Sequence, residues 1–239
     1  YSYQQVGGMF KLKIFTHSGG IVPAPEFTIV SPSNGFIISN SSVTYTLDQD
    51  LAVGTITWTA TAGTDETSHS VNLVTDGKYT TGQQHTVTLT DSPLVDGVTY
   101  TVKLNGKNSN DIAATEVEIT GLVYDTSAPT LSNVEIVGSD GTRPRYVMEG
   151  EDVTLSFTSN EEIETPTVKF ICNDGSGSSQ EHNIVASNSQ NNDWTAVWTV
   201  PADRTGLVTF EIPTVDKATP SNNSTHTALT TPADTVTVE

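Results

Sequence analysis

Apolar and polar residues alternate in many short runs of this sequence, and this period of two limits the possible folds more than any other feature. In runs such as 43–47 (VTYTL) and 153–157 (VTLSF), every second side chain would lie on the same face of an extended strand. Gly, Pro, Asn and Asp separate such runs at intervals of roughly 8–12 residues, a spacing typical of all-β sandwiches and barrels. We find no amphipathic helix pattern, and we therefore predict an all-β protein.

Two long stretches of the chain repeat the same order of runs, which indicates tandem domains of one fold. The corresponding runs are 43–47 and 153–157, 55–60 and 167–172, and, with an offset of one residue, 97–102 and 206–212. Each stretch holds about seven candidate strands over about 100 residues, the size of a two-sheet sandwich. We therefore expect an N-terminal extension with one strand at 1–25, a first sandwich domain at 26–126 and a second at 127–239.

The same alternation predicts which side chains face each core, because a shift of one residue would turn every apolar side chain toward water. In the first domain, the residues expected inside are Val43, Tyr45, Leu47, Ile56, Trp58, Val87, Leu89, Val98, Tyr100 and Val102. In the second domain, they are Val153, Leu155, Phe157, Val168, Phe170, Trp194, Trp198, Val208, Phe210 and Ile212.

The chain carries 28 acidic and 10 basic residues, which gives a formal net charge of −18. Nucleic acids and anionic membrane surfaces attract basic proteins, so we expect neither as a partner. No apolar run approaches the roughly 20 residues that cross a bilayer, so we expect no membrane insertion. The chain begins at Tyr1 and shows no signal peptide, which we interpret as a processed or excerpted exported protein.

Residues that commonly carry catalysis occur without the spacing that catalysis needs. The histidines lack the spacing of zinc sites, and no G-x-S-x-G, P-loop or dinucleotide motif is present. Cys172 is the single cysteine, so no intramolecular disulfide can form, and its place in the alternation predicts that it packs in a core. We therefore expect that the protein is not an enzyme. The dispersed histidines are His17, His69, His85, His182 and His226.

Three segments of the chain resemble the bacterial-type immunoglobulin-like repeats of large extracellular surface proteins and adhesins. These segments are 94–102 (LVDGVTYTV), 125–130 (DTSAPT) and 150–155 (GEDVTL). The resemblance implies two tandem immunoglobulin-like β-sandwich domains, an extracellular or cell-surface location, and a structural task as spacer, stalk, adhesive tip or filament subunit. It identifies a fold and not a ligand, because one fold hosts many functions.

A calcium site at the junction of the two domains is the main chemical hypothesis. The candidate ligands are Asp125 in the linker, Glu149 before the second strand of the second domain, and Asp216 in a later loop. Calcium takes six to eight oxygen ligands, and these three places can converge at one pole of a sandwich; the resemblance implies that Asp125 takes part. The alternative is that the carboxylates are solvated loop charges. The matching loop of the first domain, 105–108, contains no acid, so we expect no second site.

The N-terminal run 9–15 (MFKLKIF) would place Phe10, Leu12 and Ile14 on one face of a strand and its lysines on the other. The run has three interpretations. It is the last strand of a preceding domain, or it adds to the sheet edge of its own domain, or it is donated to an open edge on a neighbouring copy. Donation would build head-to-tail filaments, because a heterologous contact that does not close propagates.

Two features raise glycans as ligands or modifications. Asn40 and Asn223 begin N-x-[ST] sequences in expected loops, so they are candidate glycosylation sites in a secretory eukaryote. The three tryptophans, Trp58, Trp194 and Trp198, could form a sugar-stacking platform, but the alternation places all of them inward. We expect a mechanical function, with neighbouring copies or adjacent immunoglobulin-like domains as partners. The alternative is a carbohydrate- or ligand-binding module of an adhesin or secreted enzyme.

Overall fold

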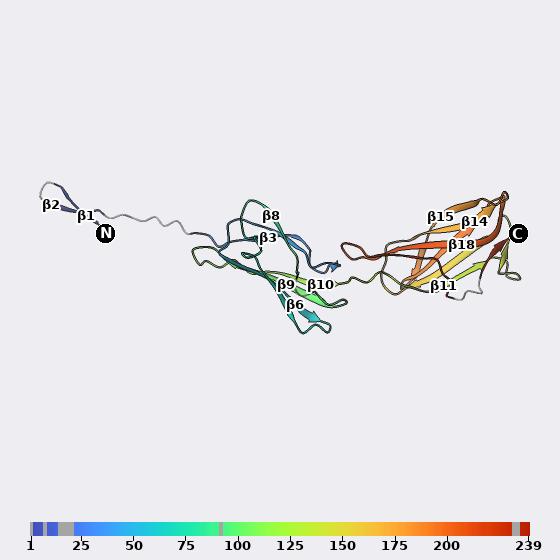
Figure 1. The fold of residues 1–239 in the computed structure, drawn as a ribbon, viewed down its shortest axis with the longest axis horizontal. Coiled ribbons are helices and arrows are strands. Elements are labelled where there is room, and N and C mark those ends of the chain that lie inside the picture. Colours follow the sequence, from blue (N-terminus) through green and yellow to red (C-terminus); the bar gives the residue numbers. More distant parts are fainter. Residues whose placement is uncertain (1, 7–8, 14–21, 91–92, 231–234) are drawn as a thin grey trace.

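The computed structural model describes residues 2–6, 9–13, 22–90, 93–230 and 235–239, and all regular structure in these ranges is β-strand (Figure 1). Within these ranges, no helix is long and apolar enough to cross a membrane. Two N-terminal strands precede two sandwiches that follow one another along the chain. These first strands are β1 (Ser2–Val6) and β2 (Met9–Lys13).

The first sandwich packs a five-stranded sheet of order β4-β10-β9-β6-β7 against a three-stranded sheet of order β3-β5-β8. Short connections that contain Gly or Asp join β5 to β6 at 48–52 and β6 to β7 at 63–67. The strands are β3 (Phe27–Ser31), β4 (Ile37–Ile38), β5 (Val43–Leu47), β6 (Val53–Ala62), β7 (Ser68–Asn72), β8 (Gln84–Val87), β9 (Thr99–Lys107) and β10 (Val117–Tyr124).

The second sandwich repeats this plan. One sheet has the order β12-β20-β18-β14-β15, with β19 also paired to β18, and the other has the order β11-β13-β17-β16. The strands are β11 (Leu131–Gly138), β12 (Tyr146–Val147), β13 (Asp152–Ser159), β14 (Thr167–Asp174), β15 (Ser179–Val185), β16 (Ser187–Gln190), β17 (Asp193–Thr199), β18 (Arg204–Val215), β19 (Asn223–His226) and β20 (Thr237–Val238).

The two sandwiches share an immunoglobulin-like strand order, in which the first, second and fifth main strands face the third, sixth and seventh. In each sandwich the first strand lies in one sheet, and the short strand after it pairs in parallel with the last strand of the other sheet. These parallel pairs are β4 with β10 and β12 with β20. The predicted all-β, immunoglobulin-like fold is therefore confirmed.

Each sandwich encloses its own hydrophobic core, and the two cores share no residue. Every residue predicted to face inward is buried except Leu89, which is half-buried and packs against the first core. Trp58 pairs with Val102 across β6 and β9, and Phe170 pairs with Phe210 across β14 and β18, so large side chains meet on the inner faces. Burying a large side chain of this kind contributes about 1.5–3 kcal/mol, so these pairs are major terms in the stability of each sandwich.

The side chains that could have indicated reactivity or sugar binding lie inside these cores. Cys172 is buried, and its burial raises the pKa of its thiol, which disfavours the reactive thiolate. Trp58, Trp194 and Trp198 are all buried, so none of them can form an exposed stacking platform. The Gly/Ser-rich stretch 175–178 connects β14 to β15 as a hairpin loop.

The N-terminal extension differs from the single strand that we expected. Strands β1 and β2 pair with each other in antiparallel register, with Val6 opposite Met9. Gly7-Gly8 between two short runs is a sequence signal of a hairpin. Among the described strands, neither β1 nor β2 pairs with a sheet of the first sandwich. The side chains of Phe10 and Leu12, and the whole of Ile14, lie outside what the structure describes.

Candidate functional site at the junction of the two sandwiches

The first residues of the linker between β10 and β11 are hydrogen-bonded to the first sandwich. The amide of Asp125 donates to the carbonyl of Ile38 at 2.8 Å. Asp96 then accepts from the amide of Thr126 at 2.6 Å, from its hydroxyl at 2.8 Å, and from the hydroxyl of Ser127 at 2.9 Å. The hydrogen bond from the Thr126 amide is the largest cause of the lowered pKa of Asp96. The first half of the linker is therefore fixed to the first sandwich by one ionised carboxylate.

The second half of the linker is fixed to the second sandwich. Ser224 Oγ donates to the carbonyl of Pro129 at 2.6 Å, and His226 Nε2 lies 3.2 Å from the same oxygen. The amide of Thr130 donates to Asn160 Oδ1 at 2.7 Å. Hydrogen bonds therefore hold both ends of the linker, which removes most of the bending freedom that a free connection of this length would have.

A loop of the second sandwich also pairs directly with the first. Thr219, which lies between β18 and β19, forms a parallel bridge with Ile38 of β4. Its amide donates to the carbonyl of Ile37 at 3.0 Å, and its carbonyl accepts from the amide of Ser39 at 3.4 Å. Figure 1 shows this loop extending from the second sandwich toward the first. The loop thus adds one residue of strand to the edge of the five-stranded sheet.

Three carboxylates meet beside this loop. Asp125 comes from the linker, Glu161 from the loop after β13, and Asp216 from the loop after β18, and their oxygens lie within 4.8 Å of one another. Asp216 is only 2% exposed, and the other two side chains are half-buried. Loops at the same pole of the sandwich supply Glu161 and Asp216, and the linker enters at that pole.

Backbone and amide groups hold Asp216 in place. Its Oδ1 accepts from the amides of Ala218 at 3.1 Å and Asn222 at 2.8 Å. Its Oδ2 accepts from Asn222 Nδ2 at 2.7 Å, and the same side chain donates to the carbonyl of Asp125 at 3.0 Å. Asn222 therefore connects the acidic loop to the linker.

Burial and the negative charges of the two neighbouring carboxylates shift the pKa of Glu161. Burial, followed by the charge of Asp125, a hydrogen bond to Asp125 and the charge of Asp216, raises the pKa of Glu161 to about 7. Such a group can be neutralised by a proton or by a cation. The donor set consists of carboxylate oxygens with carbonyls nearby, which suits a hard divalent ion such as Ca²⁺ and not a thiophilic metal.

The structure brings two of the three predicted ligands together and replaces the third. Asp125 and Asp216 belong to the cluster, but Glu149 does not. Glu149 precedes β13 whereas Glu161 follows it, and a strand of 8 residues separates them by about 25 Å at about 3.3 Å per residue. Glu149 therefore lies toward the opposite pole, and its assignment to this site was wrong. The acidic turn 160–162 after the strand was the sequence signal for Glu161.

The first sandwich carries an uncharged version of this arrangement. Asn108 follows β9 as Asp216 follows β18, and its Oδ1 accepts from the amide two residues later, that of Asn110, at 3.0 Å. Gln49 occupies the position of Glu161: Asn108 Nδ2 donates to its Oε1 at 2.9 Å, and its Nε2 donates to the carbonyl of Pro23 at 3.1 Å. One hydrogen bond joins the two amides, and their remaining polar groups bond to the backbone.

The remaining candidate residues lie apart from the junction cluster. Asn40 is half-buried between β4 and β5, and its Oδ1 accepts from the amide of Ser42 at 2.9 Å. Asn223 is exposed at the start of β19.

A second buried polar group joins a loop to the core of the first sandwich. Asp65 Oδ2 accepts from the hydroxyl of Tyr100 at 2.6 Å and lies 2.7 Å from His69 Nε2. The pKa of Asp65 is strongly lowered, first by Tyr100 and then by Thr67 and His69. Burial and the bond to Asp65 raise the pKa of Tyr100 to about 12. This arrangement anchors the loop after β6, and its polar groups bond to one another.

No model of a known protein family matches the sequence, and no curated protein matches it. One similar solved structure is a tetra-tandem repeat in the extending region of a large adhesion protein, with 16% identity and a TM-score of 0.30 over 89% of this chain and 49% of that one. Another is the pair of titin domains z1z2 in complex with telethonin, with 14% identity and a TM-score of 0.25 over 91% and 98% of the respective chains.

This chain thus spans about half the length of the adhesion-protein structure. The fold assignment rests on the strand order, register and buried cores of the two sandwiches.

Proposed function

We propose that this chain is a structural, non-catalytic pair of immunoglobulin-like modules that acts as a semi-rigid rod segment in an extracellular surface protein. The observation that carries the proposal is the backbone pairing of Thr219 with β4, combined with a linker that is hydrogen-bonded to both sandwiches. A flexible connection needs none of these bonds. A connection that transmits force or keeps a distance needs them, because each bond restricts the angle between the sandwiches.

The rigid joint is tested by measuring the distance between the sandwiches in solution. Spin labels at exposed positions Ser70 and Ser187, with Cys172→Ala to remove the native thiol, report that distance and its spread. We expect a narrow distribution in the intact chain. Thr219→Pro removes the amide that donates to Ile37, and it should broaden the distribution, whereas Thr219→Val keeps the amide and should not. A broad distribution in the unmodified chain would refute the rod.

A cation at the junction belongs to the same proposal. Asp125, Glu161 and Asp216 would ligate Ca²⁺ through their carboxylates, and the ion would offset the burial and the neighbouring charges that raise the pKa of Glu161. A ligand that binds only the folded protein stabilises it by about 2.7 kcal/mol at 100 times its Kd. The ion would therefore both stabilise the second sandwich and fix the linker to it.

The first sandwich supplies the design of a matched control. The double variant Glu161→Gln with Asp216→Asn copies the amide pair of Gln49 and Asn108 and removes two of the three carboxylates. Asn222 Nδ2 then loses Asp216 Oδ2 as its acceptor, so the variant is compared with itself in Ca²⁺ and in chelator. We expect Ca²⁺ to raise the melting temperature of the unmodified chain and of Glu149→Gln, and to leave the double variant unchanged. Equal melting curves in Ca²⁺ and in chelator for the unmodified chain would eliminate the cation while leaving the rod intact.

A second candidate function concerns the N-terminal hairpin of β1 and β2. A two-stranded sheet is at best marginally stable in water, so this hairpin gains stability if it adds to another sheet edge. We propose that the edge belongs to a neighbouring copy, which would make the chain a polymerising subunit. Deletion of residues 1–18 should then convert polymers into monomers in analytical ultracentrifugation. Monomers of the intact chain at all concentrations would remove this candidate.

A further inference from the structure

The end of the second sandwich that lies away from the junction repeats the edge at which the first sandwich receives Thr219. Strand β12 pairs with β20 as β4 pairs with β10, so Tyr146 and Val147 occupy the positions of Ile37 and Ile38. We call residues 146–148 the tail edge. Its side chains are well exposed at both ends: Tyr146 is 44% exposed and Met148 is 46% exposed.

The hydrogen bonds of the two edges also correspond. The amide of Glu239 donates to the carbonyl of Val147 at 3.0 Å, as the amide of Asp125 donates to Ile38 at 2.8 Å. Glu239 therefore occupies the position of the linker aspartate. Carbonyls and amides alternate in direction along a strand, so the Tyr146 carbonyl and the Met148 amide point away from β20. In the first sandwich, the groups in these two places are the ones that bond to Thr219.

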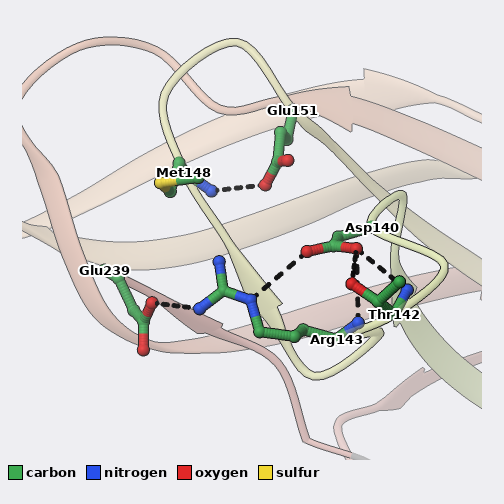
Figure 2. A network of polar contacts seen from close by, with 6 residues as sticks. All are labelled: Asp140, Thr142, Arg143, Met148, Glu151 and Glu239. Carbon is green, nitrogen blue, oxygen red and sulfur yellow. Dashed lines mark hydrogen bonds and ion pairs between the residues drawn. The ribbon is translucent and has the colours of Figure 1, made fainter.

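Charged side chains bond at the tail edge and beside it. Figure 2 shows the amide of Met148 donating to Glu151 Oε2 at 2.8 Å, and Arg143 Nη1 paired with Glu239 Oε2 at 2.8 Å. The Glu151 carboxylate thus accepts the hydrogen bond that a backbone carbonyl would accept from the Met148 amide if another strand paired here. Charged groups placed at an exposed strand edge prevent unspecific pairing while the edge is free. In the first sandwich, where the edge is covered, the amide of Ser39 donates to Thr219 instead.

We infer that the tail edge is a docking site for a further immunoglobulin-like module of the second sandwich's own kind, joined in line to Glu239. The part of that module that docks is its head, the pole that carries the loop between β18 and β19. That head would present the equivalent of Thr219 to the Tyr146 carbonyl and the Met148 amide, and it would displace Glu151. The inference rests on the proposed rod function, because it extends the geometry of one joint to the next. The occupant follows from this chain, in which the equivalent edge already holds such a head.

The test is a chain in which residues 126–239 are repeated directly after Glu239. Ser70 and Asn183 hold equivalent places, because they pair with Thr57 and Lys169 beside the matched residues Trp58 and Phe170. Spin labels on Ser70 and the first Ser187 report the first joint. Labels on Asn183 of the first copy and Ser187 of the second copy report the new joint. Each of the two labelled proteins carries Cys172→Ala in both copies.

We expect equally narrow distance distributions at the two joints. Thr219→Pro in the repeated copy alone should broaden the new distribution and leave the first unchanged, whereas Thr219→Val in that copy should change neither. Glu151→Ala in the first copy should keep the new joint narrow, because it only removes the competing acceptor.

The two possible failures are separable within one molecule. A narrow first joint with a broad new joint overturns the docking site and leaves the rod proposal standing. If the distance distribution at the new joint is narrow and Thr219→Pro does not broaden it, the docking site is also overturned, because backbone pairing of residue 219 would then play no part. A broad first joint overturns the rod and the docking site together.

Discussion

Replacing Glu161 by Gln should make the protein more stable in the absence of divalent ions. The folded pKa of Glu161 is raised to about 7 from its ordinary value of 4.5, so between these values the folded state binds more protons than the unfolded state. The contribution of Glu161 to stability is therefore greatest below pH 4.5 and is lost as the pH rises through about 7. Gln has no proton to lose, so the variant should lack this loss.

The size of the effect follows from the shift. One pKa unit corresponds to about 1.4 kcal/mol, which gives about 3 kcal/mol for the whole interval. Because Glu161 is only half-buried and solvent screens its neighbours, we expect about 1–3 kcal/mol at pH 8. If Ca²⁺ binds at the junction as proposed, it should reverse the order of stability, because Glu161→Gln removes one of the three carboxylates that would ligate it.

The assay is urea unfolding in chelator from pH 4.5 to pH 8, followed by the fluorescence of Trp194 and Trp198 in the second sandwich. Glu162→Gln is the matched control, because Glu162 is the exposed neighbour of Glu161 and lies outside the cluster. It should follow the unmodified chain at every pH. If Glu161→Gln also runs parallel to the unmodified chain across this range, the described crowding of carboxylates is refuted.

Three further changes probe the cores and the loops that hold them. Phe170→Ala, at a position with no exposed surface, should destabilise the second sandwich by about 3–5 kcal/mol in urea unfolding, and a loss below 1 kcal/mol would contradict its central place in the core. Gly138→Ala would place a methyl group 2.5 Å from Val147 Cγ1, so we expect a loss of about 1–3 kcal/mol by calorimetry, whereas Gly141→Ala, with open space around it, should be nearly neutral. Tyr100→Phe removes the hydroxyl that bonds to Asp65, and it should lower stability by about 1–3 kcal/mol and speed hydrogen exchange in the loop after β6; unchanged exchange would argue against that anchor.

The fold could be predicted well because its signal is local. Alternation along a strand decides which side chains share a face, so Trp58, Phe170 and their neighbours could be placed inside without knowing which strands pair. Leu89 is only half-buried although its run continues the pattern of β8, because the strand ends at Val87 and the ladder no longer fixes the next residues. The hairpin of β1 and β2 was missed because SYQQV at 2–6 lacks the alternation that marks a strand, so only the Gly-Gly pointed to a turn.

The candidate site could be predicted only in part, because its members are distant in sequence. Asp125 and Asp216 were recognisable as acids in a linker and a loop. The choice between Glu149 and Glu161 depended on the direction in which β13 crosses the sandwich, since the two residues flank the same strand at opposite ends. Local composition is acidic at both places and does not encode that direction.

By itself, the sequence determined that this chain forms two strand-rich units with separate cores, because the alternation of apolar residues is a property of neighbours along the chain. Only the tertiary structure decided that Thr219 pairs with Ile38, and that Glu161 meets Asp125 and Asp216. These contacts join residues brought together by the packing of whole sheets, and backbone pairing at a sheet edge uses groups that every residue has. For that reason, no pattern of side chains in the sequence predicts the joint between the two sandwiches.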